Sequence, residues 1–206
     1  MAIIDLIIIG GGASGLSCAI TLASAHRKPW FGDRRILVVD DDRSDLNQAI
    51  LYNAPGVSPG TTGTELLQEL RTQLEQFSVA SVLESRALRI RRHPDSGFEV
   101  ALDDGTTPRC EALVLATGYK RWEVEGLSND PVRHPRGGKS NRIMLEHNGI
   151  YLVEPDLHVA GLLAGGSSQF AIAAGIGAQV AVEILSDWAG KRTHVHDVIS
   201  SEKNQS

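Results

Sequence analysis

The start of the chain constrains the fold more than any other stretch of the sequence. Residues 3–9, IIDLIII, form a continuous apolar run, which is typical of a strand buried on both faces of a parallel sheet. Gly10, Gly12 and Gly15 follow at once and lead into a helical pattern, and residues 34–42, RRILVVDDD, predict a second buried strand. This order predicts a βαβ unit.

The three glycines have the spacing G-x-G-x-x-G, and each position has a physical use. The first glycine permits a tight turn, the second lets a pyrophosphate approach the backbone, and the third lets helix and strand pack closely. Free N–H groups at the helix start attract phosphate. Asp40 ends the second strand, where its carboxylate can accept hydrogen bonds from an adenosine ribose. These features predict a dinucleotide site, but they do not choose between NAD and FAD.

The middle of the chain predicts a loop, a helix and a small sheet. A loop rich in Asn, Pro and Gly spans 47–63, and two blocks with strand-like alternation follow at 78–93 and 97–118, with DDGT as a hairpin turn. Between the loop and the first block, residues 64–77 predict a helix with one apolar face, formed by Leu66, Leu67, Leu70 and Leu74. The strand blocks predict a small β meander beside the parallel sheet.

The last part of the chain predicts one more strand and a long helix. Residues 119–149 have little periodicity and much charge, which predicts a linker, and residues 150–163 predict an extended segment and a core strand. An Ala/Gly-rich helix should then run to Gly190. The expected fold is α/β and Rossmann-like, with a central parallel sheet, flanking helices and a β meander. A single domain over 1–190 would join segments 1–118 and 150–190, followed by a polar tail at 191–206.

Composition excludes several kinds of partner. The formal net charge of the 206 residues is −5, which gives no electrostatic footprint for nucleic acid. The two cysteines, Cys18 and Cys110, lie far apart in sequence, which favours a reducing compartment. The apolar run near the N-terminus is too short to span a bilayer and runs into glycines. We therefore expect a cytoplasmic protein with no nucleic-acid and no membrane partner.

Several motifs occur in an order that points to one family. After G-x-G-x-x-G come NAPG at 53–56, TGTELLQELRTQLEQF at 62–77, LVLATG at 113–118 and a C-terminal stretch beginning VAG and continuing SQFAIAAG within 159–175. Together they resemble the FAD domain of the low-molecular-weight thioredoxin reductases, which are flavoproteins with two dinucleotide-binding domains. The resemblance implies FAD as the cofactor.

The resemblance also assigns candidate cofactor-binding residues. Reduced flavin carries negative charge near N1 and O2, which a helix N-terminus stabilises. The resemblance implies that the backbone N–H groups at the start of the final helix face that end of the isoalloxazine, which agrees with this charge. The implied contacts are Gly10, Gly12, Ala13, Ser14 and Gly15 around the pyrophosphate, Asp40 at the ribose, Asn53 near the flavin, Ala116, Thr117 and Gly118 beside the cofactor, and Gln169 and Phe170 at the final helix.

Two departures from the family pattern matter for function. The family inserts an NADPH-binding domain with a redox C-x-x-C after the A-T-G strand, whereas this chain has only residues 119–149 there, too few for a doubly wound domain. Leu162 stands where the family has an aspartate that binds the ribityl chain. Losing that contact would cost about 1–3 kcal/mol. We expect weakened FAD binding and no self-sufficient thioredoxin reductase reaction.

Three functional hypotheses remain open at this point. The first is a compact FAD-dependent oxidoreductase that receives electrons from a diffusing NAD(P)H or from a redox partner protein. The second is a non-catalytic flavin-binding or regulatory module, or one subunit of a larger redox complex, and a homodimer could cover the surface exposed by the missing domain. The third is a protein that binds NAD or another adenine nucleotide instead of FAD. No residues form a metal-binding or hydrolase pattern, and the catalytic residues are unknown. Tyr119, next to the A-T-G turn, is either a contact to flavin or substrate or, as the favoured alternative, a packed aromatic.

Overall fold

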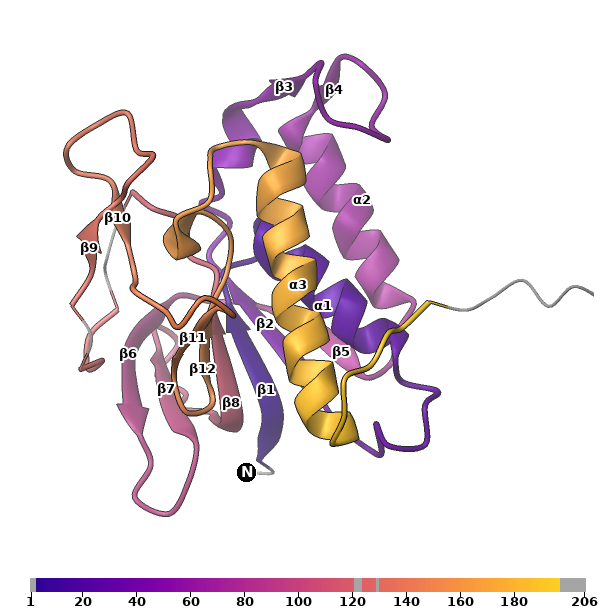
Figure 1. The fold of residues 1–206 in the computed structure, drawn as a ribbon, viewed down its shortest axis with the longest axis vertical. Helices are drawn as coiled ribbons and strands as arrows, with labels where there is room; N and C mark the ends of the chain where they lie inside the picture. The colour runs from indigo at the N-terminus through magenta and orange to yellow at the C-terminus, as the bar shows by residue number, and fades with distance from the viewer. Residues whose placement is uncertain (1–2, 121–123, 129, 197–206) are drawn as a thin grey trace, which may run out of the picture.

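The computed structural model describes residues 3–120, 124–128 and 130–196 of the chain. A parallel sheet with the strand order β11-β12-β8-β1-β2-β5 forms its centre, with β11 antiparallel to β12 at one edge (Figure 1). The strands are β1 Ile4–Ile9, β2 Ile36–Asp40, β3 Ile50–Leu51, β4 Thr61–Thr62, β5 Ala80–Glu84, β6 Ala87–Arg92, β7 Phe98–Leu102, β8 Arg109–Leu115, β9 Val132–Arg133, β10 Ile143–Met144, β11 Leu152–Glu154 and β12 Leu157–Val159. The helices are α1 Ala13–Ser24, α2 Gly63–Glu75 and α3 Phe170–Ala189, with 3-10 turns η1 Asp45–Gln48 and η2 Gly161–Ala164.

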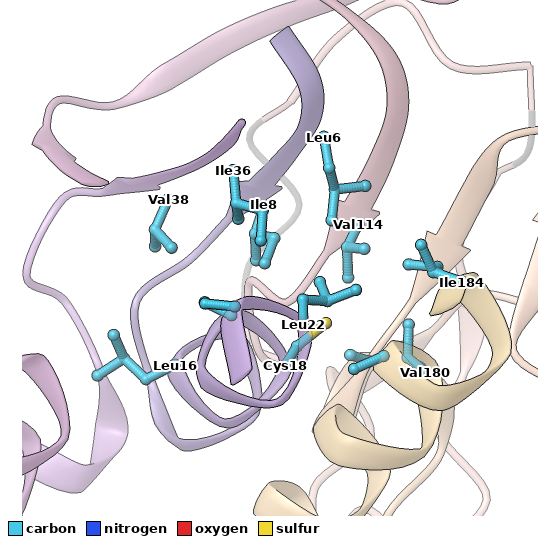
Figure 2. Close-up of a cluster of buried hydrophobic side chains, with 14 of the residues drawn as sticks. Leu6, Ile8, Leu16, Cys18, Leu22, Ile36, Val38, Val114, Val180 and Ile184 are labelled. Carbon is cyan, nitrogen blue, oxygen red and sulfur yellow. The ribbon is translucent and has the colours of Figure 1, made fainter. Parts of the chain in front are cut away.

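The first strand is apolar throughout because it is buried on both faces. Leu6 and Ile8 pack toward the helices, whereas Ile7 and Ile9 pack into a second cluster on the opposite face. Figure 2 shows the helix side, where strand residues such as Ile8 and Val114 meet side chains of α1 and α3. The expected βαβ unit is confirmed, since β1 lies between β2 and β8 and is parallel to both.

Strand β8 connects the parallel sheet to a meander. Its first residues pair antiparallel with β7, which pairs antiparallel with β6, while its last residues pair parallel with β12. The predicted DDGT turn joins β7 to β8, with Gly105 at φ +83°. The predicted strand block at 78–93 divides into two strands with different partners, because β5 joins the parallel sheet and β6 joins the meander.

The region predicted as a linker contains regular structure. In its described part, β9 and β10 pair antiparallel, and an isolated bridge joins Arg89 to Glu125. Strands of two residues leave no detectable alternation in a sequence, which is why the pattern predicted a linker alone. The domain boundaries themselves stay a prediction.

The helices follow the sequence signals closely. Helix α2 begins with a capping box in which Thr62 and Glu65 satisfy each other's backbone N–H groups, and its leucines face inward as expected. Helix α3 ends at Gly190, whose φ is +65°. By length and composition alone α3 could cross a membrane. In the fold its Val180 and Ile184 pack into the core beside α1, as Figure 2 shows.

The predicted polar tail lies partly outside the described residues. His194 and His196 are exposed, and Val195 packs against the core cluster on the helix side of the sheet. Residues 197–206 fall beyond the described ranges, so that part of the tail stays a prediction.

Candidate functional site: a cleft at the carboxyl edge of the sheet

A cleft of about 680 Å³ opens at the carboxyl edge of the parallel sheet. The carboxyl ends of β1, β2 and β8 point to it because parallel strands all finish at the same edge, which is where open α/β sheets bind ligands. Its volume falls within the range of about 300–1,000 Å³ that is usual for cofactor and drug-sized ligands. This cleft is therefore the candidate site.

The cleft gathers residues that are far apart in the sequence. Its lining includes the glycine-rich turn, the loop after β2, the loop around Asn53, the turn after β8 and the start of α3. Of the residues predicted for the cofactor, those that line the cleft are Gly10, Gly12, Ala13, Ser14, Asp40, Asn53, Ala116, Thr117, Gly118, Gln169 and Phe170. Gly15 lies beneath the turn instead.

The glycine-rich turn is fixed by close backbone contacts. Gly10 has φ +105°, and a Cβ built there would lie 2.5 Å from the carbonyl oxygen of Ala116. A Cβ on Gly15 would overlap the carbonyl oxygen of Gly10. The first and third glycines are therefore required by the packing of the turn, and the backbone of the turn is left exposed to the cleft.

Asp40 lies in the cleft wall with its carboxylate already bonded to the protein. It is 4% exposed, its Oδ1 accepts from the backbone N–H of Gly11 at 2.9 Å, and its Oδ2 accepts from Arg71 at 2.5 Å. Arg71 also contacts the exposed Asp42 at 3.3 Å. The sequence analysis missed Arg71, although a buried acid at the start of a run of three acids was a signal that a cation lies nearby.

Two helices begin at the cleft without a side-chain cap. Gly12 is the N-cap of α1 and Gln169 is the N-cap of α3, and neither helix has an acidic residue in its first turn. The first N–H groups of a helix have no intrahelical partner and carry partial positive charge. The cleft can therefore stabilise negative charge at two separate places.

Other polar groups line the cleft between these helix ends. The Oγ1 of Thr117 is buried with no hydrogen-bond partner in the described part of the chain. Nδ2 of Asn53 donates to Oε1 of Gln169 at 3.2 Å, which joins the loop after β3 to the start of α3. Lys120 forms an ion pair with Asp45, and this pair joins loops on opposite sides of β1.

Leu162 and Tyr119 occupy the part of the cleft nearest residues 130–149. Leu162 is half-buried in η2 and lines the cleft, and its carbonyl contacts the Nε2 of His134 at 3.0 Å. Tyr119 also lines the cleft and lies edge-on to His134, with ring centroids 5.3 Å apart. The predicted departure thus lies in the cleft wall, where a leucine side chain offers no hydrogen-bond acceptor.

The two cysteines are unsuited to dithiol chemistry. Cys18 belongs to the cluster on the helix side of the sheet and Cys110 to the cluster on the other side. Burial raises the pKa of the Cys18 thiol far above its ordinary value, and burial raises the pKa of Cys110 to about 12. Neither thiol is ionised at neutral pH. Within residues 3–120, 124–128 and 130–196, no group of three or more His, Cys, Asp or Glu residues is placed to bind a metal ion.

Known proteins share both this sequence pattern and this fold. A ferredoxin–NADP reductase of Listeria welshimeri is 29% identical over 123 residues, which is 60% of this chain and 37% of that protein. A thioredoxin reductase of Streptomyces coelicolor is 28% identical over 135 residues, or 65% of this chain and 39% of that protein. The chain thus spans well under half the length of these curated relatives.

The fold resembles solved thioredoxin reductases. The structure of a thioredoxin reductase from Gloeobacter violaceus aligns with a TM-score of 0.73 at 14% identity, covering 96% of this chain and 99% of that one. The pattern of the family described as pyridine nucleotide-disulphide oxidoreductase matches residues 4–141. The resemblance inferred from the motifs is confirmed, and the chain belongs to the pyridine nucleotide-disulphide oxidoreductase family with a Rossmann-like FAD domain fold.

Proposed function

We propose that the protein is a compact FAD-binding oxidoreductase that receives its electrons from a diffusing NAD(P)H or from a redox partner protein. The observation that supports this most is the convergence of two uncapped helix N-termini on one cleft. FAD carries negative charge at its pyrophosphate and, when reduced, at the pyrimidine end of its isoalloxazine. Two helix ends in one cleft match both needs.

The residues in the cleft fit FAD in further respects. Each carboxylate oxygen of Asp40 accepts one hydrogen bond from the protein. The remaining lone pairs can accept hydrogen bonds from the hydroxyls of an adenosine ribose. The buried Oγ1 of Thr117, which has no hydrogen-bond partner among the described residues, supplies a polar contact that a cofactor could use. Bound FAD would supply the capacity to accept and pass on a hydride or electrons. The chain's own residues would bind and orient the cofactor and exclude water from one of its faces.

The segment between β8 and β11 bears on how electrons would reach FAD. Residues 119–149 occupy the place of the family's second dinucleotide-binding domain, and the two cysteines lie on opposite sides of the sheet. In this proposal the electron donor would therefore reach FAD without a second dinucleotide-binding domain between β8 and β11 and without a dithiol pair formed by Cys18 and Cys110. The names of the relatives, a ferredoxin–NADP reductase and a thioredoxin reductase, support redox chemistry of this kind.

The visible absorption spectrum of the purified protein tests this proposal. We expect flavin bands in the protein as purified or after incubation with FAD. Stopped-flow mixing with NADH and with NADPH should then bleach those bands. A colourless protein that takes up no FAD would contradict the proposal, whereas bound FAD that no nicotinamide or redox protein reduces would favour the non-catalytic flavin-binding module.

A pair of glycine variants tests whether FAD binds in the cleft. Gly12→Val places a branched side chain in the cleft lining, near the Oγ of Ser44, and should abolish FAD uptake. Gly138→Val is the matched control, because a Cβ at Gly138 meets nothing within 4 Å and the residue does not line the cleft. Equal FAD uptake by both variants would show that FAD binds elsewhere.

A further inference from the structure

The turn that carries Leu162 is bound to the segment 130–149 by an unbroken series of hydrogen bonds. This turn, defined here as Gly161–Gly165, follows β12 and contributes Leu162 to the lining of the cleft. Four consecutive carbonyl groups in it, those of Leu162 to Gly165, contact donors from residues 130–149. The partners are Nε2 of His134 at 3.0 Å from Leu162, the N–H of Leu145 at 2.9 Å from Leu163, Nε2 of His147 at 3.2 Å from Ala164, and Nη1 of Arg136 at 2.8 Å from Gly165.

In His134 and His147, the hydrogen bond at Nδ1 determines which tautomer the ring adopts. The backbone N–H of Arg136 donates to Nδ1 of His134 at 3.0 Å, and the backbone N–H of Gly149 donates to Nδ1 of His147 at 3.2 Å. Because each Nδ1 accepts a hydrogen bond, each Nε2 must carry the proton. Both rings therefore donate to the turn from the neutral Nε2–H form.

The same segment is also bound to Tyr119, the other residue in this part of the cleft lining. The backbone N–H of Ile143 donates to the carbonyl of Tyr119 at 3.0 Å, and Arg142 lies over the Tyr119 ring at 5.1 Å. His134 is 2% exposed and packs edge-on against that ring. The pair of strands β9 and β10 thus connects the turn after β8 to the turn after β12.

The turn needs such support because its own sequence leaves it free. It begins and ends with glycines at positive φ, +68° at Gly161 and +83° at Gly165, and glycine gives the unfolded chain the most backbone freedom. The Cα of Gly161 also lies against Ser14, since a Cβ there would overlap the serine Oγ. A shift of the turn would therefore move Leu162 and disturb the start of α1.

We propose that residues 130–149 position the cofactor-facing turn Gly161–Gly165 in place of the lost aspartate contact, with His134 as the main positioning residue. This inference rests on the proposed function, because the turn matters to flavin only if FAD occupies the cleft. His134 acts through the Leu162 carbonyl and does not line the cleft itself. Residues 130–149 are then a scaffold for the site and not a passive linker.

Three variants separate positioning from general stability. His134→Phe keeps an aromatic ring beside Tyr119 but removes the donor to Leu162, whereas His134→Gln keeps an N–H that can replace it. His26→Phe is the matched control. His26 also contacts a backbone carbonyl, that of Ala23 at 3.0 Å, and also packs edge-on against an aromatic ring, that of Phe77, but it does not line the cleft.

The experiment uses measurements on the protein without added FAD and measurements on the protein with FAD. Amide hydrogen exchange of residues 161–166 is measured in the protein without added FAD, and the dissociation constant, absorption bands and midpoint potential are measured with FAD. For His134→Phe we expect amide exchange about tenfold faster in the turn, FAD binding about tenfold weaker, which equals about 1.4 kcal/mol, and shifted flavin bands and potential. His134→Gln should recover much of each value, and His26→Phe should change none of them.

Each contrary result is distinguishable. Unchanged exchange in His134→Phe, or the same increase in His26→Phe, would overturn the positioning role. Faster exchange with an unchanged FAD affinity and potential would overturn its importance for the cofactor while leaving the proposed function intact. Failure of the unmodified protein to bind FAD would overturn the proposed function and, with it, this inference.

Discussion

Two turns meet beside the cleft, where Gly161 packs against Ser14, and they are stabilised in different ways. The turn Gly10–Gly15 joins β1 to α1 and is fixed by contacts between its own glycines and the neighbouring Ala116. The turn Gly161–Gly165 is fixed by donors from residues 130–149, up to 29 residues away along the chain. The first turn is marked by a motif in its own sequence, although Gly10 packs against Ala116 from a distant part of the chain. The second turn depends on a segment whose sequence predicted only a linker.

The two turns differ in which of their residues can be substituted while the backbone beside the cleft keeps its conformation. Steric limits in the first turn leave only glycine at Gly10 and Gly15, so the motif is visible in the sequence. The second turn needs only that its carbonyls find donors, and many residue types can supply them. A side-chain contact such as the family's aspartate can therefore be absent from the second turn while the backbone stays in place.

The largest expected effect comes from breaking the first turn. Gly15→Val puts a branched side chain onto the carbonyl oxygen of Gly10, and a backbone atom cannot move aside. We expect the free energy of unfolding to fall by at least about 3 kcal/mol, measured by urea denaturation. Gly138→Ala should change it by less than about 0.5 kcal/mol. A Gly15→Val protein as stable as the control would disprove the steric account of this turn.

Restoring the family's aspartate would sharpen the comparison at the second turn. Leu162→Asp gives the cleft a charged acceptor while leaving the Leu162 backbone and its bond to His134 unchanged. We expect FAD to bind about 10- to 100-fold more tightly, on the usual scale of a hydrogen bond to a charged group. Fluorescence titration measures the dissociation constant, with Leu162→Asn as the uncharged control. Equal affinity in all three proteins would show that the position does not contact FAD.

The helices that leave the two turns meet at a glycine. Gly177 of α3 lies against Ser14 of α1, and a Cβ there would overlap the serine carbonyl oxygen. Gly177→Ala should therefore lower the free energy of unfolding by about 1.5 kcal/mol, because the two helices must separate. Gly175→Ala, on the exposed side of the same helix with nothing within 4 Å of a new Cβ, should raise it by about 0.5–1 kcal/mol. Thermal melts that show the same sign for both variants would contradict this packing.

The smallest effect concerns the strand that leads into the second turn. Burial lowers the pKa of His158 on β12, although Asp187, Asp156 and Glu183 oppose this shift. As the pH falls below about 6.5, the unfolded chain binds a proton before the folded protein does, so stability decreases by at most about 1.4 kcal/mol per pH unit. Above that pH the contribution is constant.

His158→Leu tests this pH dependence. The variant should lose less stability than the unmodified protein between pH 7 and pH 5, as measured by urea denaturation at each pH. The carboxyls of Glu65, Glu99 and Asp103 have lowered pKa values because of their hydrogen bonds. Their contribution to the free energy of unfolding is therefore lost at lower pH, and this loss is the same in both proteins. Parallel pH profiles for the two proteins would contradict a neutral buried His158.

Much of the site could be predicted because its signals are local. The glycine spacing, the acid that ends β2 and the A-T-G turn each follow a buried strand, and parallel strands bring their carboxyl ends together. Arg71 could not be placed in this way, because it reaches Asp40 from the middle of a helix whose sequence pattern specifies only an apolar face. The roles of His134 and His147 could not be predicted either. Their hydrogen bonds go to backbone carbonyls, which every residue type has, so the accepting positions carry no sequence motif.

The sequence by itself determined the order of the main strands and helices, the glycine-rich turn and most of the residues gathered at the carboxyl edge. Apolar runs are dictated by burial, and Gly15 is required by a steric limit that acts within a few residues, since it packs on the Gly10 carbonyl. Only the tertiary structure decided how Asp40 is compensated and how the turn at Leu162 is supported. Hydrogen bonds and ion pairs join whichever donors and acceptors the folded backbone brings within about 3 Å, and their partners can lie anywhere along the chain.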